Sequence, residues 1–236
     1  MKRLILVHGD KGGSGKSHTA QLTAAAFLQT GRPLTLIDGD AKNPGLYRYF
    51  DNKPDPVLRI NARRPDGVDA IVEAFLEASG DVLVDLPAGG SDMTARLTGA
   101  GTAAGTLDIE ALFGETGDRL TILFVIDQSR DALVALDAEM KALPRRVSEW
   151  LIVRNHRIDA PFARFDEWAV GAKLDDVVIT DMPCLDRRAI EAMVTAKAHA
   201  GEIDAVETAS ALMRIRTKAA LRAWRGELAR AGLLDA

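Results

Sequence analysis

The chain has 236 residues, of which 47% are apolar and 5% aromatic, and its formal net charge is −4 at pH 7. This length fits one large α/β domain or two small ones, and the acidic balance argues against a globally basic nucleic-acid-binding coat, though not against a local patch. The single cysteine, Cys184, excludes an internal disulfide framework and a paired-cysteine metal site. Because no apolar run approaches the length of a membrane span or a signal peptide, we expect a cytoplasmic protein.

Short apolar runs of strand length recur along the chain and alternate with helical patterns. The runs predict strands at Leu4–Val7, Leu34–Ile37, Val82–Leu86, Leu120–Ile126, Trp150–Val153 and Val177–Ile179, with a short edge strand at Val57–Ile60. The helical patterns lie at Ala20–Gln29, Val68–Ala78, Asp131–Leu143, Arg188–Ala198 and about 205–230. This alternation predicts one doubly wound α/β domain over 1–236, with a mostly parallel sheet and helices on both faces.

The first predicted strand leads into a glycine-rich turn that precedes a predicted helix. Glycines in such a turn let successive backbone N–H groups point at a polyphosphate, and the helix N-terminus adds its positive dipole end. Lys16 would reach the β- and γ-phosphates, and the Ser17 hydroxyl would bind Mg²⁺. His18 would lie near the α-phosphate or point to solvent. The predicted phosphate-binding residues are Asp10, Lys11, Gly12, Gly13, Ser14, Gly15, Lys16, Ser17 and His18.

Three carboxylates follow apolar strands at positions where parallel sheets bind ligands. Asp38 and Asp40 lie at the end of the predicted strand Leu34–Ile37, and Asp85 lies near the end of the predicted strand Val82–Leu86. Asp85 would hold Mg²⁺ through water, and the N–H of Gly89, four residues later, would sense a γ-phosphate. The residue after Asp85 is Leu86, which disfavours motor-type ATPases that place a catalytic glutamate there.

These segments resemble the ParA/MinD family of P-loop ATPases with a deviant Walker A loop. The loop fits the pattern K-G-G-x-G-K-S, whose extra lysine is Lys11, whereas Asp10 occupies the first glycine position of the strict motif. The resemblance implies that Lys11 reaches the nucleotide of a partner subunit and that Asp40 orients the attacking water. It also implies an ATP-state homodimer, with ATP or ADP and Mg²⁺ as cofactors. The implied catalytic residues are Lys11, Lys16 and Asp40, and the implied metal-site residues are Ser17, Asp38 and Asp85.

The segment after Asp40, from Asn43 to Phe50, looks nearer to TraL-type ATPases of plasmid mobilisation or stability. The resemblance covers roughly the first 90 residues well and the rest by pattern. It implies a slow ATPase switch that positions or transfers a cargo, with plasmid DNA as the leading candidate. A metabolic enzyme on the same scaffold, such as a dethiobiotin-synthetase-like ligase or a small-molecule kinase, is the alternative, although such an enzyme does not need Lys11. A nucleotide-locked adaptor with little turnover is the third interpretation.

Two segments in the second half bear on base recognition. The chain lacks the Asn-Lys-x-Asp segment that reads guanine in GTPases, which favours ATP. Asn155 resembles the family asparagine that contacts adenine, and Met182-Pro183-Cys184 resembles the loop that packs against the base. Asparagine and proline at strand ends also fit ordinary turn chemistry. Cys184 is expected to be a half-buried thiol without a functional role.

The last predicted helix combines an apolar stripe with a basic face. Leu221, Trp224 and Leu228 recur at spacings of three and four within it, which predicts a buried side. Its cations are Arg214, Arg216, Lys218, Arg222, Arg225 and Arg230. The helix could be an ordinary covering helix, a face for DNA or a DNA-bound adaptor protein, or a membrane-surface anchor, the last being the least favoured. The Gly89–Gly105 stretch is expected to be a functional loop.

Overall fold

The computed structural model describes residues 1–51, 53, 56–89, 96, 109–143, 145–172 and 174–234. Its strands form one sheet in the order β3-β2-β4-β1-β5-β6-β7, and each described pair of neighbours runs parallel. The strands are β1 (Arg3–His8), β2 (Leu34–Asp38), β3 (Leu58–Arg59), β4 (Asp81–Asp85), β5 (Arg119–Ile126), β6 (Ser148–Arg154) and β7 (Val177–Asp181). The predicted parallel α/β sheet is therefore confirmed, and β3 is an edge strand as expected.

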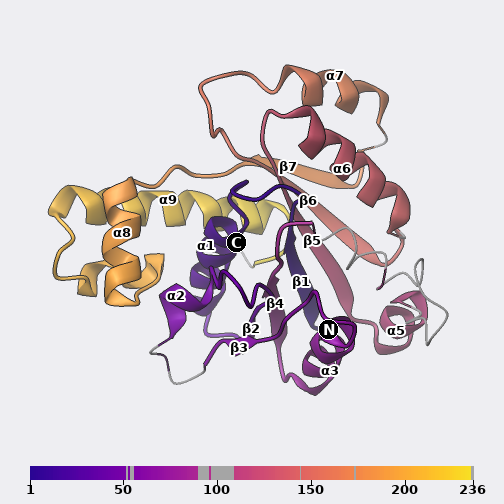
Figure 1. Ribbon diagram of the computed structural model, residues 1–236, viewed down its shortest axis with the longest axis horizontal. Coiled ribbons are helices and arrows are strands. Elements are labelled where there is room, and N and C mark those ends of the chain that lie inside the picture. The colour runs from indigo at the N-terminus through magenta and orange to yellow at the C-terminus, as the bar shows by residue number, and fades with distance from the viewer. Residues whose placement is uncertain are drawn as a thin grey trace.

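Helices cover both faces of the sheet (Figure 1). They are α1 (Lys16–Leu28), α2 (Tyr47–Phe50), α3 (Gly67–Glu77), α5 (Ile109–Thr116), α6 (Arg130–Ala142), α7 (Ala163–Gly171), α8 (Arg187–Ala196), the 3₁₀ helix η1 (Ala200–Ala205) and α9 (Ala211–Arg230). Side chains of β1 alternate between the faces, so Ile5 and Val7 pack with α1 and α9, whereas Leu4 and Leu6 pack with α3 and α6. The two hydrophobic cores lie on opposite sides of one sheet.

The elements that the sequence analysis missed are short. They are α2, α5, α7 and η1, each of at most nine residues, which is too few for a clear helical period. The C-terminal helix begins at Ala211 and not near 205, because the Ser210 side chain accepts a hydrogen bond from the Met213 N–H and caps it. The Gly89–Gly105 loop lies outside the described residues except for Gly89 and Arg96. In the described part of the chain, no helix is both long and apolar enough to cross a membrane.

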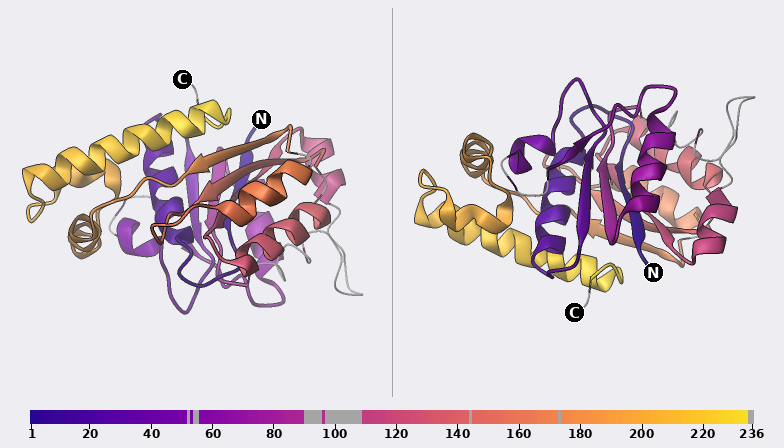
Figure 2. Two further views of the ribbon diagram at one scale, coloured as in Figure 1. Left: turned by 90° about the horizontal axis from the view of Figure 1, so that it is seen from above. Right: turned by 90° about the horizontal axis from the view of Figure 1, so that it is seen from below.

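Helix α9 packs along α1, and with α8 and η1 it extends beside the sheet (Figure 2). Its buried side includes Leu221, Trp224 and Leu228, and the Trp224 indole N–H donates to the Thr23 hydroxyl of α1 at 3.1 Å. Most of its cations have partners inside the chain: Asp186 for Arg216, Asp204 for Lys218, Gln29 for Arg225, and backbone carbonyls for Arg214 and Arg230. The covering-helix interpretation accounts for these contacts.

The Trp224 contact predicts a large stability loss on truncation. Trp224→Ala should lower the free energy of unfolding by about 3–5 kcal/mol, because it leaves a cavity between α9 and α1 and removes the hydrogen bond that the Thr23 hydroxyl accepts. Urea denaturation measures this change. The control, Arg222→Ala, changes an exposed side chain of the same helix and should stay within about 0.5 kcal/mol. A cost below about 1 kcal/mol for Trp224→Ala would show that α9 is not part of the core.

Candidate functional site

The loop between β1 and α1 is tightly enclosed by neighbouring loops. Gly13 and Gly15 have φ angles of 75° and 103°, in the left-handed region that favours glycine. A Cβ on Gly15 would lie 2.7 Å from the Asn155 amide nitrogen, so the site has no room for a side chain there. The N-terminus of α1 has no side-chain cap and no acidic residue in its first turn. Its N–H groups and dipole therefore suit an anion.

The two loop lysines face different surroundings. Lys16 is buried, and its ammonium donates to the Lys11 carbonyl at 2.8 Å. Burial lowers the pKa of Lys16, and the charges of Asp85, Asp10 and Asp40 oppose that effect. The Lys11 side chain is 44% exposed, and its ammonium lies 3.5 Å from the carboxylate of Asp127 at the end of β5. The loop thus holds one lysine inside the site and one at its outer edge.

Asp85 and Asp38 lie side by side at the carboxyl end of the sheet, because the β2–β4 register pairs these two residues. Both are buried, and the Asp38 carboxylate accepts hydrogen bonds from the N–H groups of Asp40 and Tyr47. The Asp85 Oδ1 atom has no hydrogen-bond partner among the described residues. Burial raises the pKa of Asp85 to about 7, against a hydrogen bond with Ser17.

This donor set fits Mg²⁺. One oxygen of the buried Asp85 carboxylate has no hydrogen-bond partner among the described residues, and the nearby charge of Lys16 only partly offsets the cost of burying this group. The described residues contain no cluster of three or more His, Cys, Asp or Glu side chains that could hold a metal by themselves. Mg²⁺ usually takes only one or two protein carboxylates and keeps its other positions for water and substrate phosphates. Ser17 and Asp85, with Asp38 behind them, are the residues that would hold it.

The sequence analysis missed Gly45, which the structure places against this donor set. A Cβ on Gly45 would lie 2.1 Å from the Ser17 hydroxyl oxygen and 3.1 Å from Asp85 Oδ2. The preceding turn is closed by Asp40, whose carboxylate accepts from the N–H groups of Lys42 and Asn43. In the sequence, the signal that could have located it is a glycine five residues after Asp40, the second aspartate of the Asp-x-Asp pair.

The segment after β4 contacts the phosphate-binding loop through its backbone. The Gly89 N–H donates to the Asp10 carbonyl at 2.8 Å. Its predicted role as a γ-phosphate sensor stays a prediction, and it would require the Gly89 N–H to leave the Asp10 carbonyl. Arg63, also missed from the sequence, donates to the Ala88 carbonyl beside it. The Leu86 side chain points into the core and offers no group to the site.

The predicted base-binding residues lie beside the start of α1. The Asn155 amide donates to the Ser14 carbonyl at 2.7 Å, so its nitrogen faces the loop and its Oδ1 is left to accept. The Met182 sulfur accepts from the Thr19 hydroxyl, and Pro183 is hydrogen-bonded through its backbone to His18. His18 is thus held against Pro183 and does not point to solvent; burial lowers the pKa of His18. Cys184 is exposed, not half-buried as expected.

The structure brings all of the predicted site residues to the carboxyl end of the sheet, around the β1–α1 loop. A parallel sheet with a glycine-rich loop between its first strand and helix, and aspartates at the ends of β2 and β4, defines a P-loop NTPase fold. The family model described as "ATPase MipZ" matches residues 3–85. A relative named Protein MobD, from Acidithiobacillus ferrooxidans, is 28% identical over 154 residues, or 65% of this chain and 63% of its own length.

Two solved structures share the fold over nearly the whole chain. The cell division ATPase MinD of Pyrococcus furiosus has a TM-score of 0.55 at 14% identity, covering 98% of this chain and 99% of that one. The septum site-determining protein MinD of Pyrococcus horikoshii, complexed with Mg-ADP, has a TM-score of 0.56 at 14% identity and covers 98% of both chains. At 14% identity, these two likenesses show that the chain shares the fold of the MinD ATPases.

The close approach of Gly45 predicts that a single methyl group disturbs the metal side of the site. Gly45→Ala should weaken Mg-ADP binding by about tenfold or more, because the new Cβ displaces Ser17 or the loop itself. Isothermal titration calorimetry measures the affinity. Gly226→Ala is the matched control: a Cβ there meets nothing within 4 Å, and the change should leave binding unaltered. Equal affinities in both variants would contradict a tight Gly45–Ser17 contact.

The raised pKa of Asp85 predicts a pH-dependent metal effect. Below a pKa of about 7 Asp85 holds a proton that Mg²⁺ must displace, so the Mg²⁺-dependent part of ADP affinity should fall about tenfold per pH unit as the pH drops below 7. The sign for folding is opposite: the metal-free chain loses stability from this group as the pH rises from about 4 to 7, since only the folded state keeps the proton. Thermal melts with ADP, with and without Mg²⁺, test both effects. Asp85→Asn should abolish the Mg²⁺ increment at every pH.

Proposed function

We propose that this chain is a Mg-ATP-dependent ATPase switch that dimerises in the ATP state. The observation that carries the proposal is the position of the buried Asp85, with one oxygen unpaired, beside Ser17 at the uncapped N-terminus of α1. A nucleotide phosphate on that helix end would meet Lys16 on one side and the metal ligands on the other. The P. horikoshii relative in its Mg-ADP complex has the same fold and supports this assignment.

The residues divide the work by position. Lys16 and the N–H groups of the loop and of α1 would neutralise the phosphate oxygens, and Mg²⁺ would supply a further positive charge between them. Asp40 would orient the attacking water. For this, its carboxylate would have to give up the hydrogen bonds from the Lys42 and Asn43 N–H groups, or keep them and accept from the water as well. Position 86 offers no carboxylate, so we expect slow turnover that suits a switch.

Lys11 supports the dimerising part of the proposal. Its carbonyl holds Lys16, whereas its own side chain is 44% exposed at the outer edge of the loop. From there it would serve a nucleotide in a second subunit more readily than its own. The segments after Asp38 and Asp85 both contact the loop, at Ser17 and Asp10. A γ-phosphate and Mg²⁺ would bias these contacts and so couple the nucleotide state to the surface around Lys11.

The proposed process is plasmid partition, positioning or conjugal transfer in the cytoplasm, with DNA bound directly or through a DNA-bound adaptor protein. Within the described residues, Arg222 on α9 is exposed and has no hydrogen bond or ion pair, whereas most other α9 cations bond inside the chain. This distribution favours the adaptor over a broad direct DNA contact through α9, because few cations of this helix are free to replace the counterions of a phosphate backbone.

The dimer proposal is tested by Lys11→Ala. The variant should remain a monomer with ATP, since the inter-subunit charge is lost, yet it should still bind nucleotide because the Lys11 carbonyl that holds Lys16 is unchanged. Sedimentation velocity gives the first result, and calorimetry with Mg-ADP gives the second. Lys141→Ala, an exposed lysine on α6, is the control and should dimerise normally. ATP-dependent dimers of Lys11→Ala equal to wild type would remove Lys11 from the interface.

A further inference from the structure

The outer strand β7 ends where the proposed base-binding loop begins. Among the described strands, β7 has a neighbour on one side only, which is β6, and its last residue, Asp181, is followed directly by Met182 and Pro183. The Met182 N–H bonds to the Arg154 carbonyl at the end of β6. An edge strand leaves its free side without ladder hydrogen bonds, so side chains must fix its end. The structure supplies such side chains on both faces of the strand.

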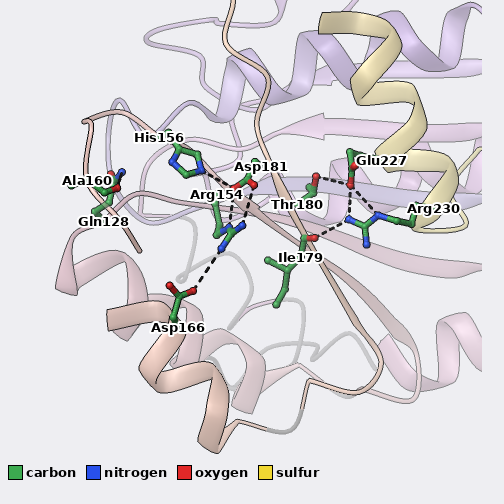
Figure 3. Close-up of polar contacts among 10 residues, drawn as sticks. All are labelled: Gln128, Arg154, His156, Ala160, Asp166, Ile179, Thr180, Asp181, Glu227 and Arg230. Carbon is green, nitrogen blue, oxygen red and sulfur yellow. Dashed lines mark hydrogen bonds and ion pairs between the residues drawn. The ribbon is translucent and has the colours of Figure 1, made fainter. Parts of the chain in front are cut away.

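On one face, Asp181 accepts hydrogen bonds from two neighbours (Figure 3). The Arg154 guanidinium donates through Nε at 2.9 Å and through Nη2 at 3.0 Å, which is a two-point contact with the carboxylate. The His156 ring nitrogen Nε2 lies 2.7 Å from Oδ1 of the same group. Arg154 also lies 3.6 Å from Asp166 of α7, and Arg154 and His156 both contact the Phe162 ring. We call Arg154, His156 and Asp181 the Asp181 cluster.

On the other face, α9 holds the preceding residues. The Thr180 hydroxyl donates to Glu227 at 2.8 Å, and Arg230 donates to the Ile179 carbonyl at 2.8 Å. Successive side chains of a strand point to opposite faces, which is why Thr180 reaches α9 while Asp181 reaches the β6–α7 side. The end of β7 is therefore fixed by side chains from two directions.

The Asp181 cluster fixes two segments that touch the phosphate-binding loop. Asn155 lies between Arg154 and His156 in the chain, and its amide bonds to the Ser14 carbonyl. Met182 follows Asp181, and its sulfur and methyl group would both lie within 3.4 Å of a Cβ on Gly15. The Asn155 segment also carries Arg157, whose Nη1 atom would lie 3.9 Å from a Cβ on Gly13, whereas Met182 offers no charged group. Both stand where the nucleoside half of a bound nucleotide would extend from the loop.

We propose that Asp181 is a positioning residue for the nucleoside half of the site, acting through Arg154 and His156. The proposal rests on the proposed nucleotide-binding function. A single ion pair this exposed is worth little, but a two-point arginine contact that shares its carboxylate with a histidine, over an aromatic ring, selects one geometry. Loss of the Asp181 charge should loosen Asn155 and Met182 together and leave the phosphate-binding loop intact.

Affinities for Mg-ADP and for Mg-pyrophosphate separate the two halves of the site. Asp181→Asn keeps the size of the side chain but replaces one acceptor oxygen with a donor that opposes Arg154. It should weaken ADP binding by about fivefold or more and change pyrophosphate binding by less than about twofold. His156→Ala removes one of the two residues that bond to Asp181, and it should give a smaller loss of ADP affinity. Asp176→Asn is the matched control, because Asp176 pairs with Arg145 at the other end of β7.

The outcomes are distinct for calorimetry on the full chain. A selective loss of ADP affinity in Asp181→Asn, with a smaller one in His156→Ala and none in Asp176→Asn, supports the proposal. An ADP affinity within about twofold of wild type in Asp181→Asn overturns it, as do equal losses for ADP and pyrophosphate, which indicate general damage. If the wild-type chain binds pyrophosphate as tightly as ADP, the nucleoside half of ADP contributes nothing to binding, and the proposal for Asp181 is overturned. If wild type binds neither, the proposed nucleotide function itself is wrong.

Discussion

The buried contact among Ser17, Asp85 and the Gly45 backbone is the constraint around which the rest of this site is arranged. The parallel register brings Asp38 beside Asp85, the glycine turn brings Ser17 above them, and only a residue without a side chain can close the gap at position 45. The Asp85 carboxylate is buried, and one of its oxygens has no hydrogen-bond partner among the described residues. Burial of a negative charge in this way favours a cation beside it.

The loop also places one lysine inside the site and another at its outer edge within six residues. Lys16 and Lys11 differ in burial and in partner, although one residue's ammonium rests on the other's carbonyl. The same division appears on the nucleoside side, where Asn155 and Met182 touch the loop and the Asp181 cluster lies behind them. Each group that would contact the ligand is held in place by a second group that would not contact it. Such support keeps a binding geometry within narrow limits.

Much of this arrangement could be predicted from the sequence. Apolar runs located the described strands because buried parallel strands are continuous in hydrophobicity, and motif spacing placed Lys16, Ser17, Asp38 and Asp85 correctly at one edge.

The contacts that depend on three-dimensional approach were not predictable. Gly45 is an ordinary loop glycine until it meets Ser17, and the Gly89 N–H looked free until the loop brought the Asp10 carbonyl to it. The cations of α9 formed a basic face in sequence, whereas folding pairs most of them with acids, amides and carbonyls of other elements. The start of α9 was misplaced because the Ser210 N-cap determines it, whereas the sequence prediction relied on the helical period of apolar residues.

The hydrogen bond from Lys16 to the Lys11 carbonyl has a consequence for the thermodynamics of ligand entry. A free lysine side chain loses up to about 2 kcal/mol of rotamer entropy when it is immobilised. Here that loss has already occurred on folding, so an arriving phosphate exchanges one acceptor for another without ordering a mobile chain. The exchange would also free the carbonyl of Lys11, the residue whose side chain pairs with Asp127. Ligand entry would thereby act directly on the backbone of the residue that carries the outer lysine.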